Sequence, residues 1–275
     1  MCSAGRENAP MRIGFIGTGN MASALAASVA GGDPGIGITG FDVSPEQLKR
    51  FRTRVPGAAA AADNREVVAT SNLVFLAVKP QAVKPVLEEI SGTDALIVSI
   101  LAGVRLAALE AALPRARLVR VMPNAPALVG AMAAAYSGGT RAGDDDLELV
   151  GAVLGHAGIA MRLPEELLDA VTGVSGSGPA FVARFIEAFT DAAIAAGIPR
   201  PAAVQLVLAT FCGTARLLEE KQLAPEELVA MVSSPGGTTV AGRAVLESSD
   251  LASVIRQTVS TTIARSRELG DEGAR

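Results

Sequence analysis

The first half of the chain alternates between short apolar runs and stretches with helical periodicity, and this pattern constrains the fold most. The runs that predict strands are residues 12–16, 36–41, 73–78, 95–100 and 118–121, with 131–136 and 159–162 as further candidates. Helical patterns begin between them, near Met21, Pro45, Asn64, Val83 and Leu106. Alternation of this kind predicts βαβ units and a parallel, doubly wound sheet.

The pattern changes near Pro164, after which the chain reads as helical. Helices are predicted over residues 178–196, from Pro201 to about Lys221, and over 239–247 and 251–269. We therefore expect a flexible extension at 1–10, a dinucleotide-binding domain at 11–163 and an all-α domain at 164–275.

The middle of the helix that ends near Lys221 is apolar nearly all round. Residues 204–211 contain only Gln205 and Thr210 as polar exceptions. A helix of this kind is usually buried on every side. In a small all-α domain this predicts burial by a second subunit, and hence a homodimer.

Composition excludes several classes of function. A net charge of -4 without a basic stripe argues against nucleic acid or anionic membrane as a partner. Cys2 and Cys212 lie far apart and His156 is the single histidine, so we expect no disulfide framework and no metal site. Residues 1–10 lack a signal-peptide core and the apolar run 202–215 is too short to span a bilayer, which predicts a soluble, cytoplasmic protein.

A G-x-G-x-x-A motif directly follows the first predicted strand and opens a helix. Gly17 permits a tight turn, Gly19 allows the backbone to approach a pyrophosphate, and Ala22 keeps the helix close to the strand. The helix N-terminus adds N–H groups and positive dipole. In this context a dinucleotide site is favoured over a simple packing turn.

Asp42 closes the second predicted strand, where an acidic residue commonly meets the adenosine ribose. Its carboxylate would accept from the 2′-OH of NADH and repel a 2′-phosphate. The alternative is an Asp that only starts the turn before Pro45, and Lys49 and Arg50 could offset the repulsion.

Two more loops follow predicted strands, at residues 77–80 and 100–103. Ligands of open α/β sheets lie outside the carboxyl ends of the strands, so both loops are expected to border the nicotinamide. Lys79 could act in catalysis or simply be solvated.

Two polar stretches interrupt the helical half, at residues 172–180 and 232–239. Each leads into a helix and contains more Gly, Ser and Thr than a helix cap requires. Exposed N–H groups with nearby hydroxyls make a carboxylate-binding nest, so these stretches are candidate ligand sites as well as candidate helix starts.

The motifs together resemble one family. In order and with sensible spacing between Met11 and Leu269, the chain contains GFIGTGNM, AVKP, VMPNAP, VSGSGPA and SSPGGTT, a combination similar to pyrroline-5-carboxylate reductase. The resemblance implies an α/β Rossmann-type domain with an all-α dimerisation domain. It also implies reduction of 1-pyrroline-5-carboxylate to L-proline, with interlocked dimers that often assemble further, typically into decamers.

The resemblance also implies site residues. The expected cofactor-binding residues are Gly17, Thr18, Gly19, Asn20, Met21, Asp42, Ser44, Asn64, Ala77, Val78, Lys79, Pro80, Ala102, Gly103 and Asn124. The expected substrate-binding residues are Glu165, Ser175, Gly176, Ser177, Gly178, Ser233, Ser234, Gly237, Thr238 and Thr239. In the family the last of these loops comes from the partner subunit.

The chain departs from the family at three positions. Asp42 replaces the usual Ser, Thr or Arg, which favours NADH where many members prefer NADPH. Ala230 replaces a frequent Asp before the SSPGG segment, and Leu101 replaces a small residue in the nicotinamide-side loop.

The implied chemistry needs few ionisable side chains. A protonated cyclic imine accepts hydride readily, so the protein mainly has to hold it in near-attack geometry. The N–H groups of residues 236–239 would hold the ring carboxylate, and Thr239 is the candidate proton donor or orienter at the ring nitrogen. The alternatives are a β-hydroxyacid dehydrogenase, for which Lys221 would have to be the base, and a catalytically silent dinucleotide-sensing protein.

Overall fold

The computed structural model describes residues 10–273, so residues 1–9 of the predicted extension lie outside the described part. The chain forms two compact units. Among the described residues, the first contains 10–177 together with 261–273, and the second contains 178–260. This division differs from the predicted boundary at 163/164, because the segment up to Ser177 contacts β6 and β7, and the end of the last helix contacts Gly103, Arg105 and Asp169.

An eight-stranded sheet forms the centre of the first unit. Its strands are β1 (Arg12–Ile16), β2 (Gly37–Phe41), β3 (Ala59–Ala60), β4 (Leu73–Leu76), β5 (Leu96–Ser99), β6 (Arg117–Met122), β7 (Met132–Gly138) and β8 (Gly158–Arg162). Their order is β3-β2-β1-β4-β5-β6-β7-β8. All neighbours pair in parallel except β6 and β7, which are antiparallel. The predicted doubly wound α/β fold is confirmed, while the short β3 and the antiparallel pair were not expected.

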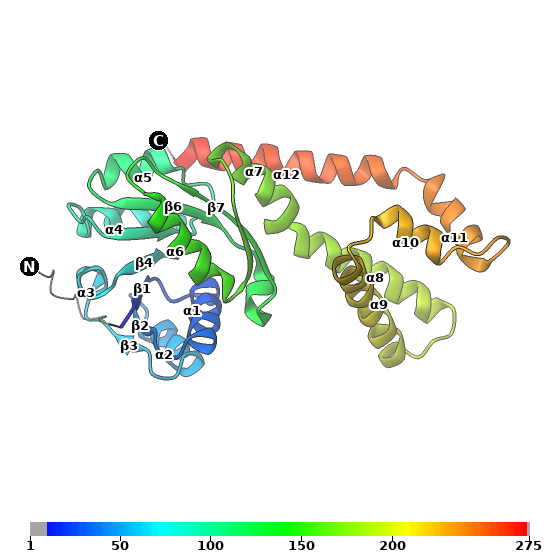
Figure 1. The fold of residues 1–275 in the computed structure, drawn as a ribbon, viewed down its shortest axis with the longest axis horizontal. Helices are drawn as coiled ribbons and strands as arrows, with labels where there is room; N and C mark the ends of the chain where they lie inside the picture. Colours follow the sequence, from blue (N-terminus) through cyan, green and yellow to red (C-terminus); the bar gives the residue numbers. More distant parts are fainter. Residues whose placement is uncertain (1–9, 274–275) are drawn as a thin grey trace, which may run out of the picture. The chain divides into compact units, whose positions relative to one another are not determined.

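Helices cover both faces of the sheet because its central strands are apolar on both sides (Figure 1). In β4, Leu73 and Phe75 pack in one core cluster, while Val74 and Leu76 pack in the other. The first cluster receives α1 (Asn20–Gly32), α2 (Pro45–Arg54) and α6 (Asp144–Gly155). The second receives α3 (Asn64–Thr70), α4 (Val83–Glu89) and α5 (Leu106–Ala112). Alternating side chains that are buried on both faces are typical of a doubly wound sheet.

The second unit is helical. The helices after the sheet are α7 (Leu168–Val171), α8 (Gly178–Ala195), α9 (Arg200–Lys221), α10 (Pro225–Met231), α11 (Thr238–Glu247) and α12 (Leu251–Gly273). α8 and α9 pack together, with Phe189 and Phe211 in an edge-to-face contact at 5.4 Å between ring centroids. Helix α6 and the short α7 and α10 were not predicted; the other helices were.

Helix α9 leaves most of its apolar surface exposed within the single chain. Only Ala203 and Val207 are buried on it, whereas Leu206 is 58% exposed and Leu208 is 43% exposed. Among the described residues it is also the one helix long and apolar enough to cross a membrane by length and composition. The burial on every side expected for residues 204–211 is therefore not supplied by the chain itself.

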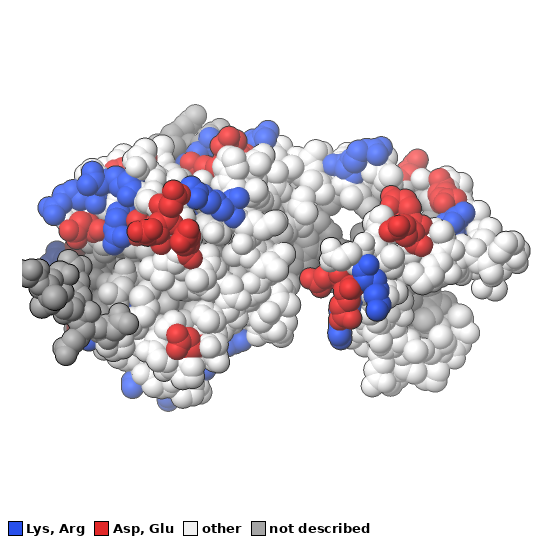
Figure 2. Space-filling view, in the orientation of Figure 1, with Lys and Arg blue, Asp and Glu red and all other residues white. Residues whose placement is uncertain are grey.

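Charged side chains are interspersed on the face that Figure 2 displays, where Lys and Arg lie next to Asp and Glu. Many of the described ion pairs are local, such as Arg50 with Glu46 and Arg216 with Glu220. Figure 2 shows no extended basic surface on this face, as expected from the net charge of -4.

Candidate active site

The strand order reverses between β1 and β4, and a cleft opens at the carboxyl ends of these strands. β1 pairs with β2 on one side and with β4 on the other, which makes a topological switch point. Ligands of open α/β sheets bind at such a point. The cleft has a volume of about 360 Å³. It is lined by Gly17, Gly19, Phe41, Asp42, Val43, Ser44, Gln47, Asn64, Ala77, Val78, Lys79, Ala82 and Val86.

The two glycines of the first motif lie in the cleft for different physical reasons. Gly17 has φ of +85°, and a Cβ there would lie 2.8 Å from the carbonyl oxygen of Ala77. Gly19 precedes α1, and a Cβ on it would meet nothing within 4 Å. Gly17 thus allows the turn itself, while Gly19 leaves open space in front of the helix N-terminus, as the predicted pyrophosphate site requires.

Asp42 is fixed by the loop that carries the glycines. Its Oδ2 accepts from the backbone N–H of Thr18 at 2.8 Å and from the Thr18 hydroxyl at 3.1 Å. Its Oδ1 accepts from the N–H of Ser44 at 2.9 Å. The carboxylate therefore has a defined orientation at the end of β2 and faces the cleft with acceptor capacity left on Oδ1.

Asn64 reaches the cleft from the start of α3 and is 4% exposed. Its backbone N–H donates to Oε1 of Glu89 at 3.2 Å, and its Nδ2 donates to Oε2 of Glu89 at 2.7 Å. The sequence did not indicate Glu89, which orients this side chain from α4. Such an anchor has no local sequence signal because the partners are 25 positions apart.

The remaining predicted cofactor residues in these loops follow β1 and β5. Thr18 is buried beside Asp42, Asn20 and Met21 begin α1, and Ala102 and Gly103 follow β5. Ala102 is exposed whereas its neighbours Leu101 and Gly103 are buried.

Asn124 hydrogen-bonds to two other segments of the chain. Its Nδ2 donates to the carbonyl of Ser175 at 3.2 Å, and its Oδ1 accepts from the N–H of Ala133 at 2.9 Å. The Ser175 hydroxyl donates to the carbonyl of Ala133 at 2.5 Å. Asn124, predicted to lie along the cofactor, thus joins the end of β6 to the predicted substrate segment.

The segment at 172–178 differs in form from the expected loop. Residues Thr172–Gly176 form a π-helical turn between α7 and α8, and the N–H of Ser177 donates to the carbonyl of Thr172 at 2.9 Å. A Cβ on Gly176 would collide with the Met122 side chain, so this glycine allows close packing against the end of β6. Residues 172–177 therefore do not form the expected nest of free backbone N–H groups. π-Helical turns are nevertheless frequent at functional sites.

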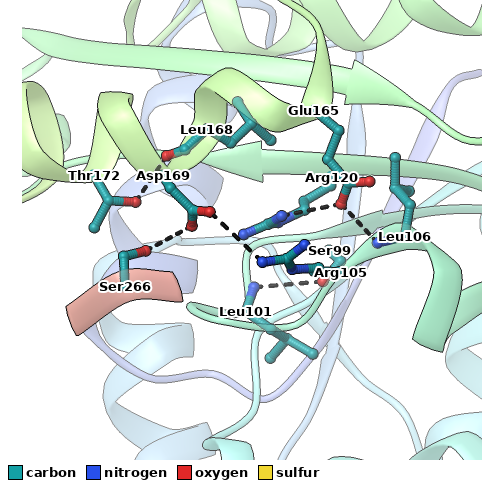
Figure 3. A network of polar contacts seen from close by, with 10 residues as sticks. All are labelled: Ser99, Leu101, Arg105, Leu106, Arg120, Glu165, Leu168, Asp169, Thr172 and Ser266. Atoms are coloured by element: carbon teal, nitrogen blue, oxygen red, sulfur yellow. Dashed lines mark hydrogen bonds and ion pairs between the residues drawn. The ribbon is translucent and has the colours of Figure 1, made fainter. Parts of the chain in front are cut away.

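Glu165 and Arg120 form a part-buried ion pair (Figure 3). Oε1 of Glu165 accepts from Nη1 of Arg120 at 3.0 Å and from the backbone N–H of Leu106 at 2.7 Å. Arg120 is 5% exposed and Glu165 lies in the short turn Glu165–Leu167. Sequence reasoning missed Arg120, because an arginine inside an apolar strand gives no indication of its partner.

The SSPGGTT segment forms a tight turn and a helix start in the second unit. The N–H of Gly237 donates to the carbonyl of Ser234 at 2.9 Å, and Gly236 has φ of +74°. With Pro235 at the second position, this is the pattern of a type II turn. Gly237 then caps α11 without a side-chain hydrogen bond, so the first N–H groups of the helix, from Thr238 onward, have no capping side chain within the described part of the chain.

Ser233 adds a second feature to this turn. Its hydroxyl oxygen is buried and has no hydrogen-bond partner among the residues that the structure describes. A buried polar group in a native protein normally has a partner, so a ligand, a water molecule or a second subunit is the expected complement. The turn thus has two kinds of hydrogen-bonding group for a ligand, the first N–H groups of α11 and the hydroxyl of Ser233.

Comparisons with known proteins give a consistent result. A family model described as pyrroline-5-carboxylate reductase dimerisation matches residues 165–269, and one described as NADP oxidoreductase coenzyme F420-dependent matches residues 12–103. A pyrroline-5-carboxylate reductase from Synechocystis is 38% identical and covers 94% of this chain and 98% of its own length. One from Methanosarcina acetivorans is 39% identical with the same coverage.

Solved structures agree with the sequence matches. The structure of a pyrroline-5-carboxylate reductase from Coxiella burnetii superposes with a TM-score of 0.88 at 32% identity, covering 95% of this chain and 99% of that one. The Plasmodium falciparum pyrroline carboxylate reductase with NADP bound has a TM-score of 0.84 at 28% identity, covering 97% and 100%.

Proposed function

The chain belongs to the pyrroline-5-carboxylate reductase family, and from this premise we propose how its residues reduce 1-pyrroline-5-carboxylate to L-proline with NAD(P)H. The observation that carries the proposal is the cleft at the switch point, where Gly17, Gly19 and Asp42 meet. The family assignment makes the chain an oxidoreductase that uses a nicotinamide dinucleotide, acts on a small molecule and associates with copies of itself.

The residues of the cleft fit such a cofactor. The open space in front of Gly19 and the N-terminus of α1 would receive the pyrophosphate, and residues 77–79 and 102–103 would border the nicotinamide side. When bound, the reduced dinucleotide supplies the hydride. The protein contributes binding, orientation and the exclusion of competing reactions.

We propose that the cofactor preferred here is NADH. Asp42 is held by Thr18 and Ser44, so its negative charge stays at the place where a 2′-phosphate would have to lie. Lys49 and Arg50 lie on α2, and Arg50 pairs with Glu46, which weakens its ability to offset that charge.

The substrate carboxylate is assigned to the turn Ser233–Thr239. The first N–H groups of α11 and the buried hydroxyl of Ser233 form a neutral anion site of the kind found at helix N-termini. Thr239, in the first turn of α11, would donate its hydroxyl hydrogen bond to the ring nitrogen or orient the protonated imine. Glu165, Ser175, Gly176, Ser177 and Gly178 are proposed to contact the substrate as well.

The oligomer is proposed to be a homodimer formed through the helical unit, with larger assemblies such as a decamer built from it. The exposed apolar side chains of α9, Leu206 and Leu208 among them, support this, because contiguous exposed apolar surface marks interaction sites. The partner's copy of the turn Ser233–Thr239 would then serve the cleft of this chain. The cytoplasmic location stays a prediction.

An absorbance assay tests the function directly. Incubating the purified full chain with NADH and 1-pyrroline-5-carboxylate should lower absorbance at 340 nm and yield proline. Absence of both changes, with NADPH tested in parallel, would contradict the proposal. The Thr239→Ala variant should bind NADH normally and lose most of kcat/KM, while Thr53→Ala, an exposed helical threonine on α2, should match the wild type.

The same assay separates the alternatives. A β-hydroxyacid dehydrogenase would oxidise a hydroxyacid with NAD⁺, and the base that it needs would have to be Lys221, which is exposed at the end of α9. A sensing protein would bind the dinucleotide and leave the imine unchanged.

A further inference from the structure

The end of α12 packs directly against the loop that follows β5. Gly103 has φ of +76°, and a Cβ on it would lie 3.3 Å from the backbone carbon and the Cβ of Leu269. A Cβ on Gly270 would lie 3.3 Å from Nε of Arg105 and 3.4 Å from the carbonyl oxygen of Gly103. The two segments are thus in close backbone contact, with a glycine at the contact on each side.

A buried hydrogen bond holds this end of α12. The Ser266 hydroxyl donates to Oδ1 of Asp169 at 2.7 Å, and both residues are more than nine-tenths buried (Figure 3). The other oxygen of Asp169 lies 4.0 Å from Nη2 of Arg105. Asp169 therefore connects α12, through Ser266, with the residue that ends the loop.

The residues on either side of Ala102 are buried, and this fixes the position of the loop at residues 101–105. Leu101 is 4% exposed and belongs to the core cluster under α4 and α5, and Gly103 is covered by Leu269. Ala102, between them, is exposed. The buried side chain of Leu101 anchors the loop in the core. The contact between Gly103 and Leu269 fixes the loop against α12.

We propose that residues 266–270 of α12 are the support of the loop at residues 101–105, and that Asp169 and Ser266 are positioning residues that keep this support in place. The inference rests on the proposed function, since the loop at the end of β5 is the one expected to border the nicotinamide. Neither residue would touch the reacting atoms. They act by fixing Ala102 and Gly103, and hence the nicotinamide end of the cofactor site.

The test compares two ligands that share one end. NADH and ADP-ribose both contain the adenosine and pyrophosphate groups, which would meet Gly17, Gly19 and Asp42, but only NADH carries the nicotinamide. Their dissociation constants for the full-length enzyme are measured by isothermal titration calorimetry. Ser266→Ala should weaken NADH binding about tenfold and leave ADP-ribose binding within twofold of the wild type.

Matched variants isolate the hydrogen bond. Ser266→Thr keeps the hydroxyl and should restore the NADH affinity, and Asp169→Asn keeps an acceptor for Ser266 and should have a smaller effect than Ser266→Ala. Ser260→Ala removes an exposed hydroxyl that bonds only locally on the same helix and should change neither ligand.

Three results would overturn the proposal. In the first, Ser266→Ala weakens the binding of NADH and of ADP-ribose equally. In the second, Ser266→Ala lowers the Tm and leaves both dissociation constants unchanged. In the third, the wild type binds NADH and ADP-ribose with the same affinity. A wild type that binds NADH more tightly than ADP-ribose but leaves 1-pyrroline-5-carboxylate unreduced would refute the proposed function instead, so the two failures are distinguishable.

Discussion

Thr18 donates both its backbone N–H and its hydroxyl to the same carboxylate oxygen of Asp42. The contact ties the glycine-rich loop after β1 to the end of β2 across 24 positions of sequence. It places a fixed negative charge beside the space left by Gly19. The proposed role of Asp42 in cofactor choice would therefore be coupled to the geometry of the loop that would bind the pyrophosphate.

Replacing Asp42 should shift the cofactor preference. Asp42→Ser removes the charge that repels a 2′-phosphate, so the ratio of kcat/KM for NADPH to that for NADH should rise at least about tenfold, or ~1.4 kcal/mol. Steady-state kinetics with both cofactors measure the ratio. Glu88→Gln removes an exposed carboxylate on α4 that does not line the cleft and serves as the control. An unchanged ratio in Asp42→Ser would remove this residue from cofactor selection.

The two glycines of the first motif should respond differently to alanine. Gly17→Ala places a methyl group against the Ala77 carbonyl at positive φ, which should lower both the stability, by about 2 kcal/mol, and the NADH affinity. Gly19→Ala places its methyl group in open space, so the Tm should stay near the wild type while NADH affinity falls. Thermal unfolding and calorimetric titration distinguish the two cases. Retained NADH binding in Gly19→Ala would mean that the space is not the pyrophosphate site.

The turn before α11 should depend on Gly236. A non-glycine residue at φ of +74° costs about 1 kcal/mol, and a distorted turn would misdirect the N–H groups of Thr238 and Thr239. Gly236→Ala should therefore raise the KM for 1-pyrroline-5-carboxylate, while Gly236→Asn, which tolerates this backbone conformation better, should retain more activity. Equal kinetics for Ala and Asn would argue against a role for the turn geometry.

Sequence patterns predicted most of the fold because its strands and helices have strong local signals. The apolar runs at β1, β4 and β5 and the glycines near β1 each act over a few residues. What the sequence did not show depends on long-range contacts. The antiparallel β6–β7 pair, the Glu89 anchor of Asn64 and the ion pair of Arg120 with Glu165 join distant positions. The π-helical turn was missed because a Gly- and Ser-rich run reads locally as a loop.

The ion pair of Arg120 and Glu165 permits a test of whether Glu165 contacts the substrate. Glu165→Ala leaves the nearly buried guanidinium of Arg120 without this partner, which should lower the free energy of unfolding by about 2 kcal/mol. The loss should be smaller than for a fully buried ion pair, because Glu165 is partly exposed. Adding Arg120→Met removes the unpaired charge and should restore most of the stability in a denaturant titration. If Glu165 binds the substrate, the KM for 1-pyrroline-5-carboxylate stays raised in the double variant. A KM that returns to the wild-type value would limit Glu165 to a structural role.

The apolar surface of α9 should control self-association. Leu206 is 58% exposed in the single chain, so Leu206→Asp should leave the fold of each subunit intact. If a second subunit covers this side chain, burying the new carboxylate becomes costly, and the dimer should dissociate at concentrations where the wild type remains associated. Light scattering coupled to size-exclusion chromatography measures the mass, and Thr53→Asp, which introduces the same charge at an exposed position of α2 outside the helical unit, serves as the control. If the turn Ser233–Thr239 of the partner subunit completes the site, Leu206→Asp should also lose kcat/KM in parallel with the loss of dimer, while retaining NADH binding in the cleft. An unchanged mass for Leu206→Asp would place the interface on another face of the helical unit, and a monomer with full activity would show that each chain supplies its own turn.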